Sequence, residues 1–149
     1  MNSNENFKFH GSMTAILQKA DGTIETTHKD NLILNVGFDF IADAIGKASG
    51  RPAVMSQIAV GTSTAAPTAS QTAMLAEIGR KAATYAHTAG TKTFTFTTTF
   101  NAGEATGALT ESGVVNATTG GIFIDRLTFP VINKGADDVV TIIFTFSMS

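Results

Sequence analysis

The sequence predicts a mainly β protein, an antiparallel β-sandwich of jelly-roll type with one short α-helix near residues 36–46. Turn signals in the second half recur at intervals of about 8 to 12 residues, as they do in sandwiches and barrels. The segments between these turns are rich in β-branched and aromatic residues, which favour strands. With 149 residues, the chain has the length of one domain. We expect that domain to span residues 12–149, after an extended arm over residues 1–11.

The first part of the chain predicts a hairpin followed by the helix. Residues 12–19 alternate in polarity, an Asp-Gly turn follows at 20–22, and residues 23–28 supply the second strand. The helix is predicted by Leu34, Phe38, Ile41 and Ile45, which recur at helical spacing. Asn35 can cap its N-terminus and Gly46 can end it. We expect the helix to close one end of the sandwich or to cover one sheet.

The middle of the chain predicts a strand, a loop and one segment whose secondary structure stays open. Ile58 and Val60 predict a short buried strand, and the small polar residues 62–71 predict a loop. Residues 74–79 fit either one or two helical turns or the start of a strand that continues through 80–88, because periodicity does not distinguish the two here.

Four further strands are predicted in residues 91–100, 107–115, 122–132 and 139–149, separated by turns rich in Gly, Asn and Asp. In the first of them, Phe and Thr residues alternate. Because strand side chains point alternately to opposite faces, we expect a phenylalanine face in the core. The threonine face then either contacts water or meets another subunit. The phenylalanines are Phe94, Phe96 and Phe100, and the threonines are Thr93, Thr95, Thr97 and Thr99.

Composition argues against several classes of function. There are 10 Lys and Arg residues against 12 Asp and Glu, a net charge of −2, so we expect no binding to nucleic acid or to anionic lipid. No apolar run approaches the roughly 18 residues of a membrane span, and the first residues have no apolar run of signal-peptide length. The chain has no cysteine, which excludes disulfides and thiolate metal sites.

The polar residues form no predicted catalytic, cofactor or metal site, and we expect that the protein is not an enzyme. His10, His28 and His87 are far apart and have no metal-ligand spacing. For two pairs of acidic residues we favour a simple structural role over cation binding. Asp39 and Asp43 share a solvated helix face, and Asp137 and Asp138 lie in a turn that lacks the rest of a calcium loop.

A glycosidase acid and base pair is one further possibility for an enzyme. Glu104 and Glu111 could act as acid and base, but both lie near glycines in predicted turns, and the chain has no Trp to stack on a sugar. We therefore expect neither to be catalytic.

The predicted arm contains Phe7 and Phe9 in a polar context. In an extended chain both side chains point the same way, and no local apolar pattern offers them a core. We expect this arm to dock on a neighbouring subunit, and we predict an interface made of Phe7, Phe9, Thr93, Thr95 and Thr97.

Four segments taken together resemble a structural module of tailed bacteriophages, found in tail fibres and in small virion proteins such as capsid cement or decoration proteins. The resemblance covers about residues 30 to 147. The most specific part of the resemblance is a series of three motifs, namely IAVGT, then a Thr/Ala/Pro loop, then a GxLTExG turn. The segments are NLILNVGFDFIADAI, QIAVGTSTAAPTASQTAMLAEIGRK, FNAGEATGALTESGVVNATTGGIFIDR and TFPVINKGADDVVTIIFTF.

This resemblance implies a β-sandwich that serves assembly and has no active site. Tail-fibre members are usually much longer, so the chain is more similar to a cement protein that is made in the host cytoplasm and staples neighbouring subunits on the capsid outer surface. Its partners would be the major capsid protein and copies of itself, as a homodimer or homotrimer. The alternative is a tail-fibre or baseplate adhesin module that binds a host glycan or another tail protein.

Overall fold

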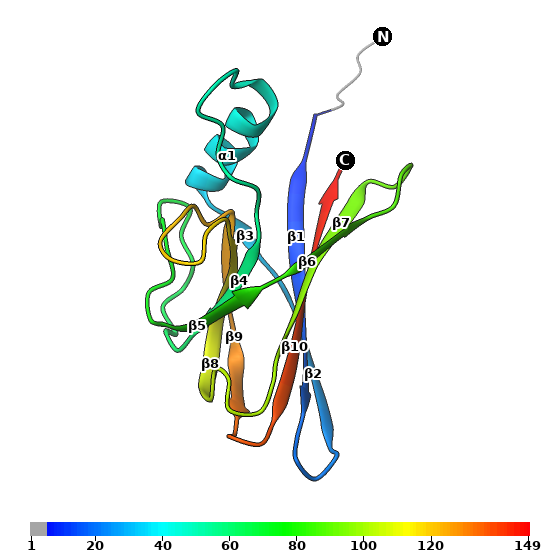
Figure 1. Ribbon diagram of the computed structural model, residues 1–149, viewed down its shortest axis with the longest axis vertical. Helices are drawn as coiled ribbons and strands as arrows, with labels where there is room; N and C mark the ends of the chain where they lie inside the picture. Colours follow the sequence, from blue (N-terminus) through cyan, green and yellow to red (C-terminus); the bar gives the residue numbers. More distant parts are fainter. Residues whose placement is uncertain (1–5) are drawn as a thin grey trace.

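The computed structural model describes residues 6–149 and confirms a mainly β fold: two five-stranded antiparallel sheets packed as a sandwich, with one helix at one end (Figure 1). The first sheet has the strand order β2-β1-β10-β7-β6, and the second has the order β3-β9-β8-β4-β5. The elements are β1 (Phe9–Gln18), β2 (Ile24–Asp30), β3 (Leu32–Ile33), α1 (Asn35–Gly46), β4 (Gln57–Gly61), β5 (Glu77–Ala82), β6 (Thr84–His87), β7 (Thr93–Phe100), β8 (Gly107–Val115), β9 (Asp125–Lys134) and β10 (Val139–Met148).

The core lies between the two sheets and follows the alternation of the strands. In the first sheet, Met13, Phe96 and Phe144 lie side by side on the inner face of β1, β7 and β10. All three belong to one buried cluster with residues of the second sheet such as Ile58 and Leu127. The predicted phenylalanine face of residues 92–100 is thereby confirmed, since Phe96 and Phe100 are buried and Phe94 packs against them.

The ambiguous segment 74–79 enters a strand. β5 begins at Glu77 in the second sheet, and the chain then passes through Ala83 into β6 of the first sheet. The backbone N–H of Ala83 donates to the carbonyl of Ser56 at 2.9 Å. One continuous segment therefore joins the two sheets along one side of the sandwich (Figure 1).

The expected apolar stripe of the helix is only partly buried. Leu34 is buried and Ile41 packs against the core. Phe38 and Ile45, in contrast, are 50% and 79% exposed. The side of the helix that carries Gly37 faces the body of the protein. The closest approach is at Gly37, where an added Cβ would lie 2.2 Å from the carbonyl oxygen of Ile124. Only glycine permits that contact.

The expected helix cap was also wrong. Leu34 is the N-cap residue and makes no side-chain capping bond. The backbone N–H of Asn35 instead donates to the carbonyl of Ala69 at 2.9 Å. The loop before β5 therefore supplies a hydrogen-bond acceptor for one of the free N–H groups at the start of the helix.

Residues 9–11 of the expected N-terminal arm belong to the first sheet, and residues 1–5 lie outside the described residues. β1 begins at Phe9, which is paired with Met148 on β10. The expectation that Phe9 lacks a core within its own chain was wrong, because its ring stacks on Phe146 with centroids 5.4 Å apart. Residues distant in sequence supply that contact, so no local pattern could reveal it.

Truncation of Phe96 tests the register of β7. We expect Phe96→Ala to lower the free energy of unfolding by about 3 kcal/mol. This is the lower end for a buried aromatic ring, because Phe96 lines an apolar cleft at the end of the sandwich that carries the helix. Thr95→Ala on the opposite face should have a much smaller effect. Urea unfolding followed by circular dichroism measures both, and equal losses would contradict this register.

In residues 6–149, no helix is long and apolar enough to cross a membrane.

Candidate interaction site

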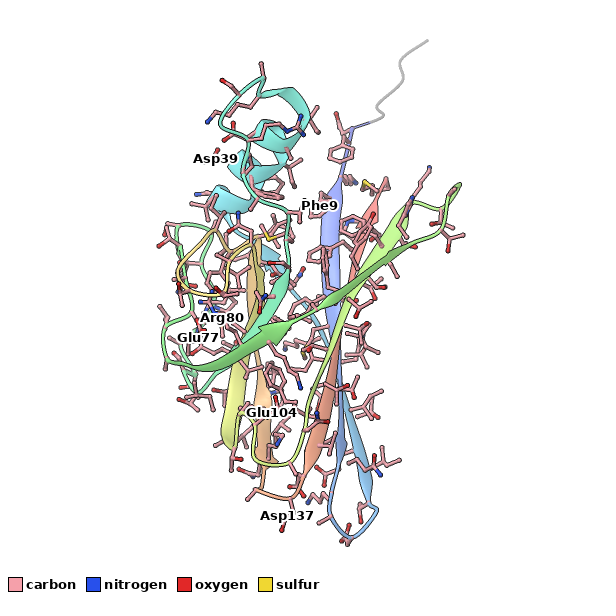
Figure 2. All side chains as sticks on the ribbon, viewed as in Figure 1. Phe9, Asp39, Glu77, Arg80, Glu104 and Asp137 are labelled. Carbon is pink, nitrogen blue, oxygen red and sulfur yellow. The ribbon has the colours of Figure 1, made fainter. Side chains whose placement is uncertain are left out.

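An apolar cleft opens at the end of the sandwich that carries the helix. It lies between α1 on one side and the ends of β1, β7 and β10 on the other, and it has a volume of about 650 Å³. Figure 2 shows Phe9 at this end, with Asp39 on the helix opposite and Asp137 at the far end of the molecule. Among the described residues, no Asp, Glu, Lys or Arg lines the cleft. Such a surface offers apolar contact and little else.

Aromatic rings cover the wall of the cleft on the side of the first sheet. The Phe94 and Phe146 rings stack with centroids 5.3 Å apart, and Tyr85 lies against Phe96 at 5.5 Å. Phe9 completes the group by stacking on Phe146. Because these rings hold each other at offset and tilted angles, the wall is preformed and does not depend on a ligand.

A second surface lies on the outer face of the same sheet. The strand registers align Thr14, Ile143, Thr97 and Thr84 in one row across β1, β10, β7 and β6. The neighbouring rows contain Ser12, Thr145, Thr95 and Ala86 on one side and Ile16, Thr141 and Thr99 on the other. We call these three rows the hydroxyl face.

The hydroxyl face carries no charged side chain on these four strands. Thr99 and Thr141 share a hydrogen bond between their hydroxyls at 3.0 Å, and most members are half-buried by their neighbours. A surface that orders water through evenly spaced hydroxyl groups would need a regular Thr-x-Thr pattern on adjacent strands. Ile143 on β10 interrupts that pattern. The result is a neutral surface of methyl and hydroxyl groups.

The five residues predicted as an interface fall on these two surfaces. Phe7 and Phe9 lie together at the cleft, whereas Thr95 and Thr97 belong to the hydroxyl face and Thr93 lies at its border. The structure therefore brings them together in two groups on opposite faces of one sheet, not in one site.

The three histidines are separate in space as well as in sequence. The ring of His28 pairs with the hydroxyl of Thr14 at 2.9 Å, and the ring of His87 lies 2.8 Å from the carbonyl oxygen of Thr93. His10 lies on β1, on the outer face of the first sheet. In residues 6–149, no group of three His, Cys, Asp or Glu side chains could hold a metal ion.

The acidic candidates have separate partners within the fold. Asp43 lies 3.9 Å from Lys47 on the helix, and Asp138 accepts from the backbone N–H groups of Gly135 and Ala20. Glu104 pairs with Lys81 at 2.9 Å, and this hydrogen bond lowers the pKa of Glu104. Glu104 and Glu111 thus belong to different ion pairs.

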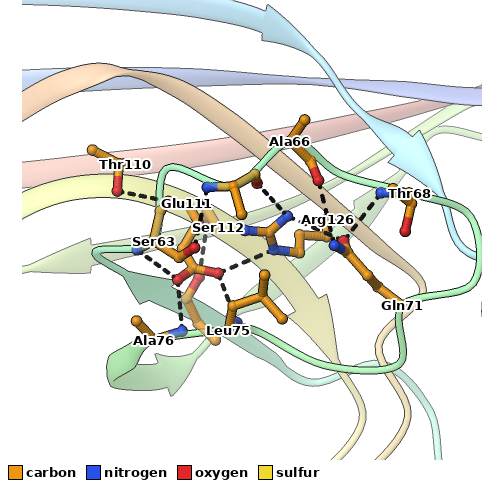
Figure 3. A network of polar contacts seen from close by, with 12 residues as sticks. Ser63, Ala66, Thr68, Gln71, Leu75, Ala76, Thr110, Glu111, Ser112 and Arg126 are labelled. Carbon is orange, nitrogen blue, oxygen red and sulfur yellow. Dashed lines mark hydrogen bonds and ion pairs between the residues drawn. The ribbon is translucent and has the colours of Figure 1, made fainter.

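A buried polar network, drawn in Figure 3, is the main feature that the sequence did not predict. Glu111 is fully buried in the middle of β8, not in a turn. Its carboxylate accepts from the backbone N–H groups of Ser63, Leu75 and Ala76 at 2.9, 3.0 and 2.8 Å. The Arg126 Nε donates to the same carboxylate at 3.1 Å.

Arg126 extends the network into the long loop between β4 and β5. Its Nη1 donates to the carbonyl of Ala65 at 2.9 Å and to the side-chain oxygen of Gln71 at 3.1 Å. Both charges are completely buried, so the network can only hold the loop in place and cannot reach a substrate. A sequence signal did exist, since Glu111 interrupts the apolar pattern of β8 and Arg126 lies at the start of the next strand, β9.

Asp125 is a second buried acid, and it has no basic partner among the described residues. Its Oδ1 accepts from the N–H of Val114 at 2.8 Å, and its Oδ2 accepts from the amide of Asn31. Burial raises the pKa of Asp125 to about 7, although these two hydrogen bonds act in the opposite direction. The site lies inside the sandwich and is a structural feature.

No protein-family model, curated protein or solved structure matches this chain.

Proposed function

We propose that this chain is a structural protein of a tailed-bacteriophage virion, and within the virion a cement protein that staples neighbouring subunits on the outer surface of the capsid. The resemblance of residues 30 to 147 to phage structural modules supports the virion role. The observation that carries the binding role is the pair of neutral surfaces on opposite faces of the first sheet. A protein that joins neighbours needs two such surfaces that do not overlap.

The chemistry of the two surfaces suits assembly. Interface cores are depleted in charged residues and enriched in aromatic ones. The cleft meets both criteria, and the hydroxyl face meets the first. In this proposal the hydroxyl face contacts the major capsid protein, and no cofactor, nucleic acid or membrane takes part.

Copy number in purified virions tests the proposal. Quantitative mass spectrometry should find the chain in a constant ratio to the major capsid protein, and antibody should reach it on intact particles. A few copies per particle, confined to the tail, would favour a tail-fibre or baseplate module instead. Complete absence from virions would contradict a virion role.

A substitution on the hydroxyl face tests the contact with the capsid. We expect Thr97→Lys to weaken binding to particles that lack the chain by more than about tenfold, because a charge without a partner would be buried in the interface. Val131→Lys is the matched control, since Val131 is a 53% exposed apolar residue on β9 of the second sheet. Co-sedimentation measures both. Equal binding of the two variants would remove the hydroxyl face from the contact.

A further inference from the structure

The cleft exposes apolar side chains that a protein alone in water would normally bury. Those at its mouth are Phe7 at 68% exposure, Ile45 at 79%, Val54 at 77% and Tyr85 at 58%. Its floor is formed by the buried residues Phe96 and Ile124. A continuous apolar patch of this kind marks an interaction surface.

The shape of the cleft limits what can fill it. The floor lies between the two sheets, so a flat partner surface would cover the mouth and leave the interior empty. The hydroxyl of Tyr85 is the single hydrogen-bonding side-chain group in the lining formed by the described residues. Inserted backbone would therefore lose its hydrogen bonds, at a considerable cost in free energy. An aromatic or aliphatic side chain from a partner fits both conditions.

The chain itself carries a side chain of this kind. Phe7 lies at the mouth of the cleft, yet it remains 68% exposed. Two backbone hydrogen bonds between Lys8 and Ser149 hold the chain beside β10 just after Phe7. Because Phe7 is only two residues before β1, it can reach another copy only if the two molecules lie with their clefts facing each other.

We propose that two copies of the chain exchange Phe7 across a twofold axis, each inserting this ring into the cleft of the other. The exposed ring of Phe7 favours a second copy as the partner, and the charge of the cleft is compatible with it. A twofold interface brings each surface against itself, so any charge near the axis would meet a like charge. The cleft lining contains none. The inference names one partner within the proposed assembly function and rests on that function for its biological role.

Sedimentation equilibrium of the full chain tests the proposal. The wild type should form dimers at micromolar concentration. Phe7→Ala and Ile45→Lys should each weaken dimerisation on the order of 30-fold or more, as expected for an anchor residue at an interface centre. Ile24→Lys is the control, since Ile24 is a 63% exposed apolar residue on β2 that does not line the cleft. This variant should dimerise like the wild type. Circular dichroism and the thermal midpoint verify that each variant is folded.

A mixing experiment distinguishes exchange of Phe7 from any other dimer. Ala44→Trp fills the cleft but keeps Phe7, whereas Phe7→Ala keeps the cleft but has no ring to insert. Each variant alone should be monomeric. A mixture should form heterodimers that contain one intact contact, with an affinity between those of the variants and the wild type.

Two results would overturn the inference. One is a wild type that stays monomeric at a concentration of about 10⁻⁴ M, where a dimer with a micromolar dissociation constant would be almost fully formed. The other is a dimer that neither cleft variant weakens. A monomeric chain that still binds capsids at high copy number would refute the exchange of Phe7 alone. A dimer that is absent from virions would refute the virion role alone.

Discussion

Replacing Glu111 with alanine is expected to lower the free energy of unfolding by about 3 to 5 kcal/mol, because it leaves a buried guanidinium without its counter-charge. The loss extends beyond Arg126. Three backbone N–H groups of the loop between β4 and β5 also lose their acceptor. Urea unfolding at neutral pH measures the effect.

Two further variants identify the cause of that loss. Glu104→Ala removes another glutamate from an ion pair, but Glu104 and Lys81 are both partly exposed, so its effect should be much smaller. The double variant Glu111→Leu with Arg126→Met removes both buried charges. It should lose less stability than the sum of its single variants, since neither charge is then left unpaired. If Glu111→Ala stays within about 1 kcal/mol of the wild type, the network does not hold the loop.

The contribution of Asp125 to the stability of the protein is expected to fall as the pH rises from about 4 to about 7. The pKa of Asp125 is raised from 3.8 to about 7 in the folded protein by burial. Folding therefore favours the protonated acid, and the stability it contributes is complete below pH 3.8 and is lost as the pH rises through 7. A shift of this size corresponds to about 4 kcal/mol.

Asp125→Asn isolates this effect from the other titrating groups. Asparagine keeps an acceptor for the N–H of Val114. Once the Asn31 side-chain amide turns over, the new amide can donate to the buried side-chain oxygen of Asn31, which has no partner in the structure. The difference in unfolding free energy between this variant and the wild type should grow with pH up to about 7 and then level off. A difference that is constant between pH 4 and pH 8 would contradict the raised pKa.

The hydroxyl face and the cleft differ in how much of each could be predicted from the sequence. The threonines of the hydroxyl face were placed together on one side of a strand by alternation alone. Their alignment with Thr14, Thr141 and Thr145 depends on the registers of β1 and β10, which come from distant parts of the chain. The cleft needed still more long-range information, since α1, β6, β7 and both chain ends contribute to its walls.

The sequence by itself determined the features that depend on local periodicity and turn chemistry. The period of two in residues 92–100 predicted which side of β7 is buried, and the turn residues located most of the strands. A helix was predicted at the correct position because its apolar spacing is also local.

Tertiary structure decided the features that depend on how distant segments approach each other. The face that α1 buries was decided by the close contact between Gly37 and Ile124, since the neighbouring apolar stripe has the same helical period. Phe9 joined the core because Phe146, at the other end of the chain, lies next to it. Glu111 and Arg126 became a buried pair because adjacent strands and a loop enclose both of them. Periodicity describes one element at a time, whereas burial depends on which other elements lie against it.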